Sequence, residues 1–151
     1  MKKLASLVLS AATVSLVVVA FAAAAQRAET YKVSAALTAG HEVPKPKGAV
    51  GAYGTFTGTY VENATGAVLK WKLTYTHLTG RALAAHIHAG KFGVAGPVIV
   101  PLCGPCRSGQ RGTARITKAN VAALEGHRAY VNVHTAKNAG GEIRGQVKVT
   151  G

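Results

Sequence analysis

Short runs in which apolar and polar residues alternate are the feature that most constrains the fold of this 151-residue chain. Residues 68–77 give the clearest case, because every second position is a large apolar or aromatic residue and the positions between are mostly lysine or threonine. Successive side chains of a β-strand point to opposite faces, so this run predicts a strand with one face on a core and one in water. The chain is therefore expected to form an antiparallel sheet.

Similar runs recur along the chain, separated by Gly, Pro and Asn residues. The expected strands cover residues 31–38, 53–60, 68–77, 82–89, 97–102, 114–117, 129–135 and 141–149. Thr117 is a suitable N-cap for a short helix over residues 118–125, which Gly126 would end. Many short strands with frequent turns predict an all-β fold, a single-domain antiparallel β-sandwich or barrel, here with one short helix.

The N-terminal segment has the composition of a secretory signal peptide. Two lysines precede an apolar run over residues 4–21, and four alanines follow it. A retained membrane anchor is the alternative, but the run ends in small residues instead of a charged stop. We expect a signal peptide over residues 1–25, a linker over residues 26–32 and a β domain over residues 33–150. The mature protein would be secreted or periplasmic, without a membrane span.

Basic residues strongly outnumber acidic ones. The chain has 18 Lys and Arg against five acidic residues, all Glu, so loss of the first two lysines would leave a net charge of +11 (18 − 2 − 5). This balance favours anionic cell-surface polymers as partners, although dispersed charge is also typical of a solvated surface. No recognition motif accompanies the charge, so specific nucleic-acid binding is not expected.

Cys103 and Cys106 are the only cysteines and form a C-x-x-C motif. A thioredoxin-like redox site needs a helix after its first cysteine. Residues 107–112 show no helical apolar period and instead predict a loop. In an oxidising compartment the pair is expected to form a structural disulfide that closes a loop tip. Thiolate metal ligation and redox catalysis are the alternatives.

Histidines occupy the polar face of two expected strands. His86 and His88 flank one isoleucine, so both point to the same side, about 6.6 Å apart at Cα. His134 lies on the polar side of residues 129–135 together with Asn132. Side chains placed in this way can converge on one ion or ligand.

Charged residues would surround this histidine cluster. A hairpin between the last two expected strands would place Glu142 and Arg144 opposite or diagonal to His134. Glu142 or Glu42 could then act as a fourth ligand or as an outer partner of a ligand. Three imidazoles favour Zn or Cu over Ca or Mg. The alternative is a hydrogen-bonded network that sets strand register without any ion.

Five blocks of the sequence together resemble the CHRD (chordin) domain family. They are LTAGHEVP (37–44), AAHIH (84–88), GPVIV (96–100), YVNVHT (130–135) and GGEIRGQ (140–146). The resemblance implies a secreted β-sandwich or β-barrel domain, of the kind repeated in chordin, an antagonist of growth-factor signalling. It does not by itself supply a reaction. His41 stands where the family usually has Asn, which makes it a candidate additional ligand, whereas His77 and His127 are expected at the surface.

The leading hypothesis is a non-enzymatic, exported binding or structural domain whose polar-face site holds a transition metal or a polar ligand group. A metalloenzyme, either an oxidoreductase or a hydrolase, could use the same three histidines around an open-sited metal. A third hypothesis is a cationic adhesion module for anionic cell-surface polymers, and a protein partner is also possible. The chain has no Asp, which removes the carboxylate that the zinc site of Cu/Zn superoxide dismutase uses and argues against that activity.

Overall fold

The computed structural model describes residues 29–151, so the predicted signal peptide and the first part of the predicted linker lie outside the described residues. The described part has nine strands, one short 3-10 turn and one α-helix. Their bounds are β1 Thr30–Thr38, η1 Ala39–His41, β2 Tyr53–Asn63, β3 Gly66–Thr76, β4 Ala82–Ala89, β5 Val98–Cys103, β6 Gln110–Thr117, α1 Lys118–Glu125, β7 Ala129–Thr135, β8 Ile143–Gln146 and β9 Lys148–Thr150. Within residues 29–151, no helix is long and apolar enough to cross a membrane.

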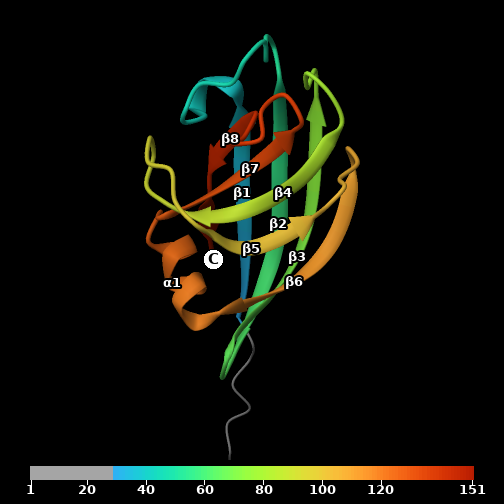
Figure 1. Cartoon of the computed structure of the whole chain (residues 1–151). Coiled ribbons are helices and arrows are strands. Elements are labelled where there is room, and N and C mark those ends of the chain that lie inside the picture. The colour runs from blue at the N-terminus through green and yellow to red at the C-terminus, as the bar shows by residue number, and fades with distance from the viewer. Residues whose placement is uncertain (1–28) are drawn as a thin grey trace, which may run out of the picture.

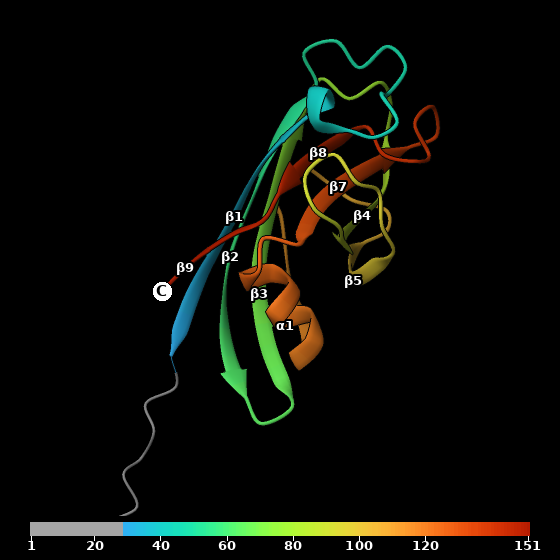
Figure 2. The ribbon, with the colours of Figure 1, turned by 90° about the vertical axis from the view of Figure 1, so that its left-hand side faces the viewer.

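All strands belong to one sheet in the order β5-β4-β7-β8-β1-β2-β3-β6, and β9 pairs with β1. The edge strands β5 and β6 lie near each other, so the sheet nearly closes into a barrel (Figure 1). The long strands β1, β2 and β3 form one wall, and β4, β5, β7 and β8 form the wall opposite (Figure 2). The predicted all-β fold with a single short helix is confirmed.

The core lies between the two walls and follows the predicted alternation. On β3, Leu69 and Leu73 have no exposed surface, whereas Lys70 between them is exposed. On the opposite wall, Ile87 and Val131 are equally buried. Each wall thus turns its apolar residues inward, and the outer face of each wall is left for polar side chains.

The helix forms where it was predicted. The hydroxyl of Thr117 accepts a hydrogen bond from the backbone N–H of Asn120, and α1 ends at Glu125, before Gly126. Val121 and Leu124 are buried, and the helix contacts β3, β6 and β9. Figure 2 shows α1 beside the long strands of the sheet.

Two expected strands differ most from the structure. The single strand expected over residues 141–149 is two short strands, because Val147 leaves the ladder and donates to Ala129 O. β6 begins at Gln110, inside the segment predicted as a loop. Gly112 accounts for that difference. It pairs with Trp71 of β3, and a Cβ there would collide with the indole ring. The large apolar side chain at this point therefore comes from β3, and the sequence of β6 itself lacks, at this position, the apolar residue that would have marked it as a strand.

Cys103 and Cys106 lie as a close pair between β5 and β6, with Cα atoms 5.3 Å apart. The next element after them is the strand β6 and not the helix that a thioredoxin-like site needs. Backbone N–H of Cys106 donates to Ala82 O, and the hydroxyl of Tyr75 donates to Cys106 O. The pair therefore closes a loop tip that is tied to β4 and β3.

Candidate metal centre

β4 and β7 place three histidines on the outer face of one wall. The antiparallel register sets Ala84 opposite His134 and His86 opposite Asn132, and His88 lies two residues further along β4. Ile87, between the two β4 histidines, points into the core and is fully buried. The pleat of the strands, which the sequence predicted, therefore brings the imidazoles to one side.

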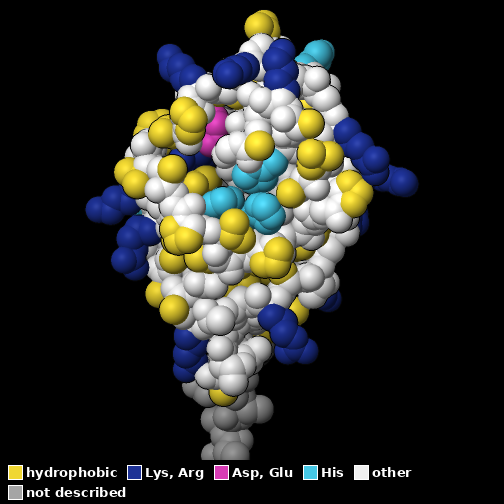
Figure 3. Space-filling view, in the orientation of Figure 1, with side chains coloured by type: hydrophobic (Ala, Val, Ile, Leu, Met, Phe, Trp, Pro, Cys, Tyr) yellow, Lys and Arg dark blue, Asp and Glu magenta, His cyan; other side chains and the backbone are white. Residues whose placement is uncertain are grey.

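The three rings converge. One nitrogen from each of His86, His88 and His134 lies within 4.8 Å of the other two, and among the described residues this is the only group of three or more metal-ligating side chains so close together. His86 Nδ1 is 3.1 Å from His134 Nε2. Histidine side chains are gathered near the middle of this face (Figure 3). The predicted convergence is confirmed, and no carboxylate belongs to the group.

Backbone carbonyls determine which nitrogen of two rings carries a proton. His88 Nδ1 lies 2.8 Å from Gly96 O, and His134 Nδ1 lies 2.9 Å from Ala139 O. A carbonyl oxygen can only accept, so each Nδ1 is the donor and each neutral ring keeps a lone pair on Nε2. His88 Nε2 is buried and has no hydrogen-bond partner. The β4–β5 loop, through Gly96, and the β7–β8 loop, through Ala139, thereby orient the two rings, as hydrogen-bond partners of metal-bound histidines do.

Burial keeps these imidazoles neutral. Burial, together with the positive charge that His134 and His88 would carry, lowers the pKa of His86 to about 4. Burial also lowers the pKa of His88 and of His134, although the carbonyls of Gly96 and Ala139 oppose the shift. Neutral rings are the form that can bind a metal ion.

Arg144 of β8 lies beside the cluster, in the row that continues from His86 through Asn132. It is only 1% exposed, and its Cζ lies 3.4 Å from the centroid of the Tyr130 ring. Its Nη2 donates to the carbonyls of Lys91 and Val94, both at 2.9 Å. The guanidinium therefore holds the β4–β5 loop over the polar face.

Glu42, which directly follows η1, lies near Arg144 and Asn132. It is 3% exposed, and its Oε1 accepts from the N–H of Val43 at 3.1 Å. Burial raises the pKa of Glu42, while the Val43 N–H, the charge of Arg144 and the amide of Asn132 partly oppose this. A Cβ at Gly141 would collide with the Glu42 carboxylate, so this glycine makes room for it.

Several polar atoms on this face are buried and unpaired. They are Glu42 Oε2, His88 Nε2, Asn132 Oδ1, Arg144 Nη1 and Gln146 Oε1. Buried polar atoms in native proteins nearly always have a partner, so such a concentration in one place indicates a site that accepts a polar ligand, an ion or water.

A family model of the CHRD domain matches residues 33–147. The chain belongs to the CHRD domain family. Searches of curated proteins and of solved structures return no match. The match runs from within β1 to the end of β8, so it includes all of β4, β5, β7 and β8, the wall that carries the three histidines and is called the histidine wall below, together with the loops that orient the rings.

The expected place of Glu142 is corrected by the structure. Its carboxylate accepts hydrogen bonds from the hydroxyls of Thr79 and Thr135 and from the amide of Asn138, and it does not join the histidine group. Burial would raise the pKa of Glu142, but these hydrogen bonds lower it. Strand alternation fails here because Glu142 precedes β8 and follows Gly141, whose φ is +133°.

The remaining histidines of the CHRD domain lie outside the cluster. His77 and His127 are exposed, as predicted. His41 is half-buried, and its ring packs edge-on against Phe92 with centroids 5.3 Å apart. His41 is not part of the group of three, so the departure from the family pattern adds no ligand to it.

Tyr130 of β7 takes part in the site in a way that the sequence did not predict. Its ring stacks on His88 with centroids 5.0 Å apart and also carries the Arg144 guanidinium. Its hydroxyl accepts from the N–H of Gly96, whose carbonyl in turn holds His88. The signal that could have revealed this role is the position of Tyr130 on the same face as Asn132 and His134.

Proposed function

We propose that this CHRD domain binds one transition metal ion, Zn or Cu, through His86, His88 and His134. The observation that carries the proposal is the convergence of the three rings, two of which present an unprotonated Nε2 because a carbonyl accepts from the opposite nitrogen. The Nε2 of His88 has no partner, and that of His134 lies at hydrogen-bond distance from His86 Nδ1. Imidazole nitrogens suit these metals better than they suit Ca or Mg.

The spacing fits such an ion with small side-chain movements. Tetrahedral zinc with Zn–N bonds of about 2.0–2.1 Å separates its nitrogens by about 3.4 Å. His86 Nδ1 and His134 Nε2, at 3.1 Å, already match this value. The nitrogens that now lie up to 4.8 Å apart would approach by rotation of the half-buried rings of His86 and His134.

Three neutral nitrogen ligands leave a coordination position free. The buried unpaired atoms of Glu42, Asn132 and Arg144 lie on the same face and support a polar group held next to the ion. We infer a binding domain whose metal presents this open position to a ligand.

Metal titration of purified protein tests the proposal. After chelator treatment, wild type should bind one equivalent of Zn or Cu, followed by calorimetry and by elemental analysis. His86→Ala and His134→Ala should each lose at least about tenfold in affinity, since each removes a ligand. His77→Ala and His127→Ala, which remove exposed histidines, should bind as wild type does. Equal affinity in all five proteins, or no binding by wild type, would refute the site.

Export is part of the proposed function. The lysines, apolar run and small residues at the N-terminus support cleavage after Ala25, and the close Cys103–Cys106 pair suits an oxidising compartment. Intact-mass measurement should show loss of 25 residues from the exported protein and, after alkylation, two unmodified cysteines. A full-length mass would contradict the processing, and two alkylated thiols would contradict the disulfide.

A metalloenzyme is the second candidate, and Glu42 favours it. A buried carboxyl with a raised pKa and an unpaired oxygen is suited to move a proton at a group bound near the metal. Zinc-loaded protein should then hydrolyse members of a panel of chromogenic carboxylic and phosphate esters. Turnover should fall in Glu42→Gln while metal affinity stays unchanged; turnover unaffected by this change would remove Glu42 from the reaction.

A further inference from the structure

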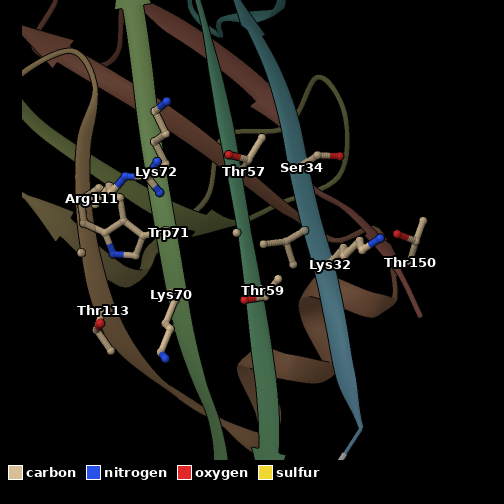
Figure 4. Close-up of a pocket in the computed structure, with 13 residues that line it drawn as sticks. Lys32, Ser34, Thr57, Thr59, Lys70, Trp71, Lys72, Arg111, Thr113 and Thr150 are labelled. Atoms are coloured by element: carbon tan, nitrogen blue, oxygen red, sulfur yellow. The ribbon is translucent and has the colours of Figure 1, made fainter.

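The opposite wall of the barrel carries a second surface of different chemistry. A trough of about 830 Å³ crosses the outer face of β1, β2, β3 and β6 (Figure 4). It lies on the wall that contributes nothing to the histidine cluster, so it is independent of the proposed metal site.

Two parallel rows of polar side chains border the trough. The strand register aligns Ser34, Thr57, Lys72 and Arg111 in one row. The second row consists of Lys32, Thr59, Lys70 and Thr113. Strands lie about 4.8 Å apart, so each row is about 14 Å long, and the rows are about 6.7 Å from each other. The trough is therefore long and straight enough for several units of an extended polymer.

The floor between the rows has no protruding side chain. Gly58 and Gly112 both pair with Trp71, and the Trp71 side chain is 4% exposed. A Cβ at Gly112 would point inward and collide with the Trp71 ring, so a larger residue there would displace the indole beneath the floor.

The trough carries four cations and no carboxylate among its lining residues. The five glutamates of the chain all lie elsewhere. Glu42 and Glu142 are buried at the other wall. Glu29 and Glu125 accept hydrogen bonds from the hydroxyls of Tyr31 and Tyr60, and Glu62 lies near these two tyrosines. No acidic side chain thus competes for the trough, which favours an anionic occupant.

We propose that this trough binds a linear acidic polysaccharide. Its lysines and arginine suit carboxylate or sulfate groups, and the hydroxyls that alternate with them suit the hydroxyl groups of sugars. Single-stranded nucleic acid is a poorer match because the one aromatic residue of the lining, Trp71, is too buried to stack on bases. An anionic membrane is also a poorer match, since the lining has no exposed large apolar side chain to insert.

Binding of sodium polygalacturonate to the full mature chain, with chelator present, tests the assignment. Calorimetry gives the affinity, and the emission of Trp71, the only tryptophan, reports on the packing directly beneath the trough. Lys70→Glu combined with Lys72→Glu should weaken binding by at least about tenfold and lower the slope of log affinity against log salt by about two. The matched control, Lys118→Glu with Lys137→Glu, changes the net charge equally outside the trough and should weaken binding less than about threefold.

A second pair of variants separates a sugar from a simple polyanion. Thr57→Val with Thr59→Val leaves the charge unchanged and should weaken polygalacturonate about threefold or more while keeping the salt slope. No effect of these two changes would overturn the assignment to a polysaccharide. Equal losses in the trough and control charge variants would overturn the site itself. Tighter binding of an oligodeoxythymidylate or of phosphatidylglycerol vesicles than of polygalacturonate, lost in the Lys70/Lys72 variant, would assign the trough to nucleic acid or membrane instead.

Discussion

The two walls of the barrel use polar residues in opposite ways. On the histidine wall, Glu42, Asn132 and Arg144 are all 3% exposed or less, and the imidazoles are held neutral by burial. On the trough wall, Lys70 and Arg111 are exposed and no acid faces them. Burial gives the first wall fixed geometry, whereas exposure gives the second wall charge at little cost in free energy.

This contrast has a consequence for stability. A buried polar group that loses its partner keeps its desolvation cost, so changes on the histidine wall should lower the free energy of unfolding. An exposed side chain is hydrated in both states, so changes in the trough should alter binding and leave folding nearly intact.

The largest stability effect is expected at Arg144. Arg144→Met should lower the free energy of unfolding by about 3 kcal/mol, because it removes the bonds to Lys91 and Val94 and leaves buried Glu42 without its positive neighbour. Arg111→Met, the same change in the trough, should cost less than about 0.5 kcal/mol. Urea denaturation of both variants measures the difference. A similar loss in the free energy of unfolding for both variants would contradict the proposed difference between the walls.

The next largest loss of stability is expected from a substitution at Gly141. Gly141→Ala places a Cβ against the Glu42 carboxylate at a φ of +133°, which should cost about 2 kcal/mol. The adjacent Gly140→Ala is a matched control, since a Cβ there meets no atom within 4 Å. Thermal denaturation compares the two, and a Gly141→Ala protein as stable as the control would contradict the placement of Glu42.

The histidine wall should also make stability depend on pH. In chelator-treated protein the unfolded chain takes up protons at the ordinary His pKa of 6.5, whereas His86 in the folded state resists protonation down to about pH 4. The unfolded state thus binds more protons in this window, and the free energy of unfolding should fall as the pH falls from 6.5 towards 4. The raised pKa of Glu42 acts in the opposite direction above its ordinary value of 4.5 and offsets part of the loss.

Denaturation at a series of pH values checks this behaviour. His86→Asn should flatten the dependence between pH 6.5 and 4, whereas the exposed His77→Asn should leave it as in wild type. A slope that is the same in all three proteins would show that the cluster is not its origin.

The smallest effect is expected in the trough. Lys70→Ala with Lys72→Ala should change the free energy of unfolding by no more than about 0.5 kcal/mol and should leave metal affinity at the wild-type value. Urea denaturation and the metal titration measure both quantities. A loss of metal affinity would show that the two walls are coupled.

Local structure followed from the sequence alone. The strands over residues 82–89 and 129–135 and the helix over residues 118–125 have the predicted bounds. Alternation along one strand is a property of the backbone at each residue, so His86 and His88 had to share a face once β4 formed. The cap at Thr117 is equally local, because it involves only residues three positions apart.

The neighbours of each side chain were decided by the tertiary structure. His134 reaches His86 only because β7 pairs with β4, and Lys72 meets Arg111 only because β3 pairs with β6. Glu142 left the cluster because one glycine with positive φ turned the chain before β8. Such placements depend on hydrogen bonds between segments far apart in the chain and on single backbone dihedrals. The period of a strand carries no information about either, so the histidine faces were predictable from the sequence, whereas the assembled sites required the fold.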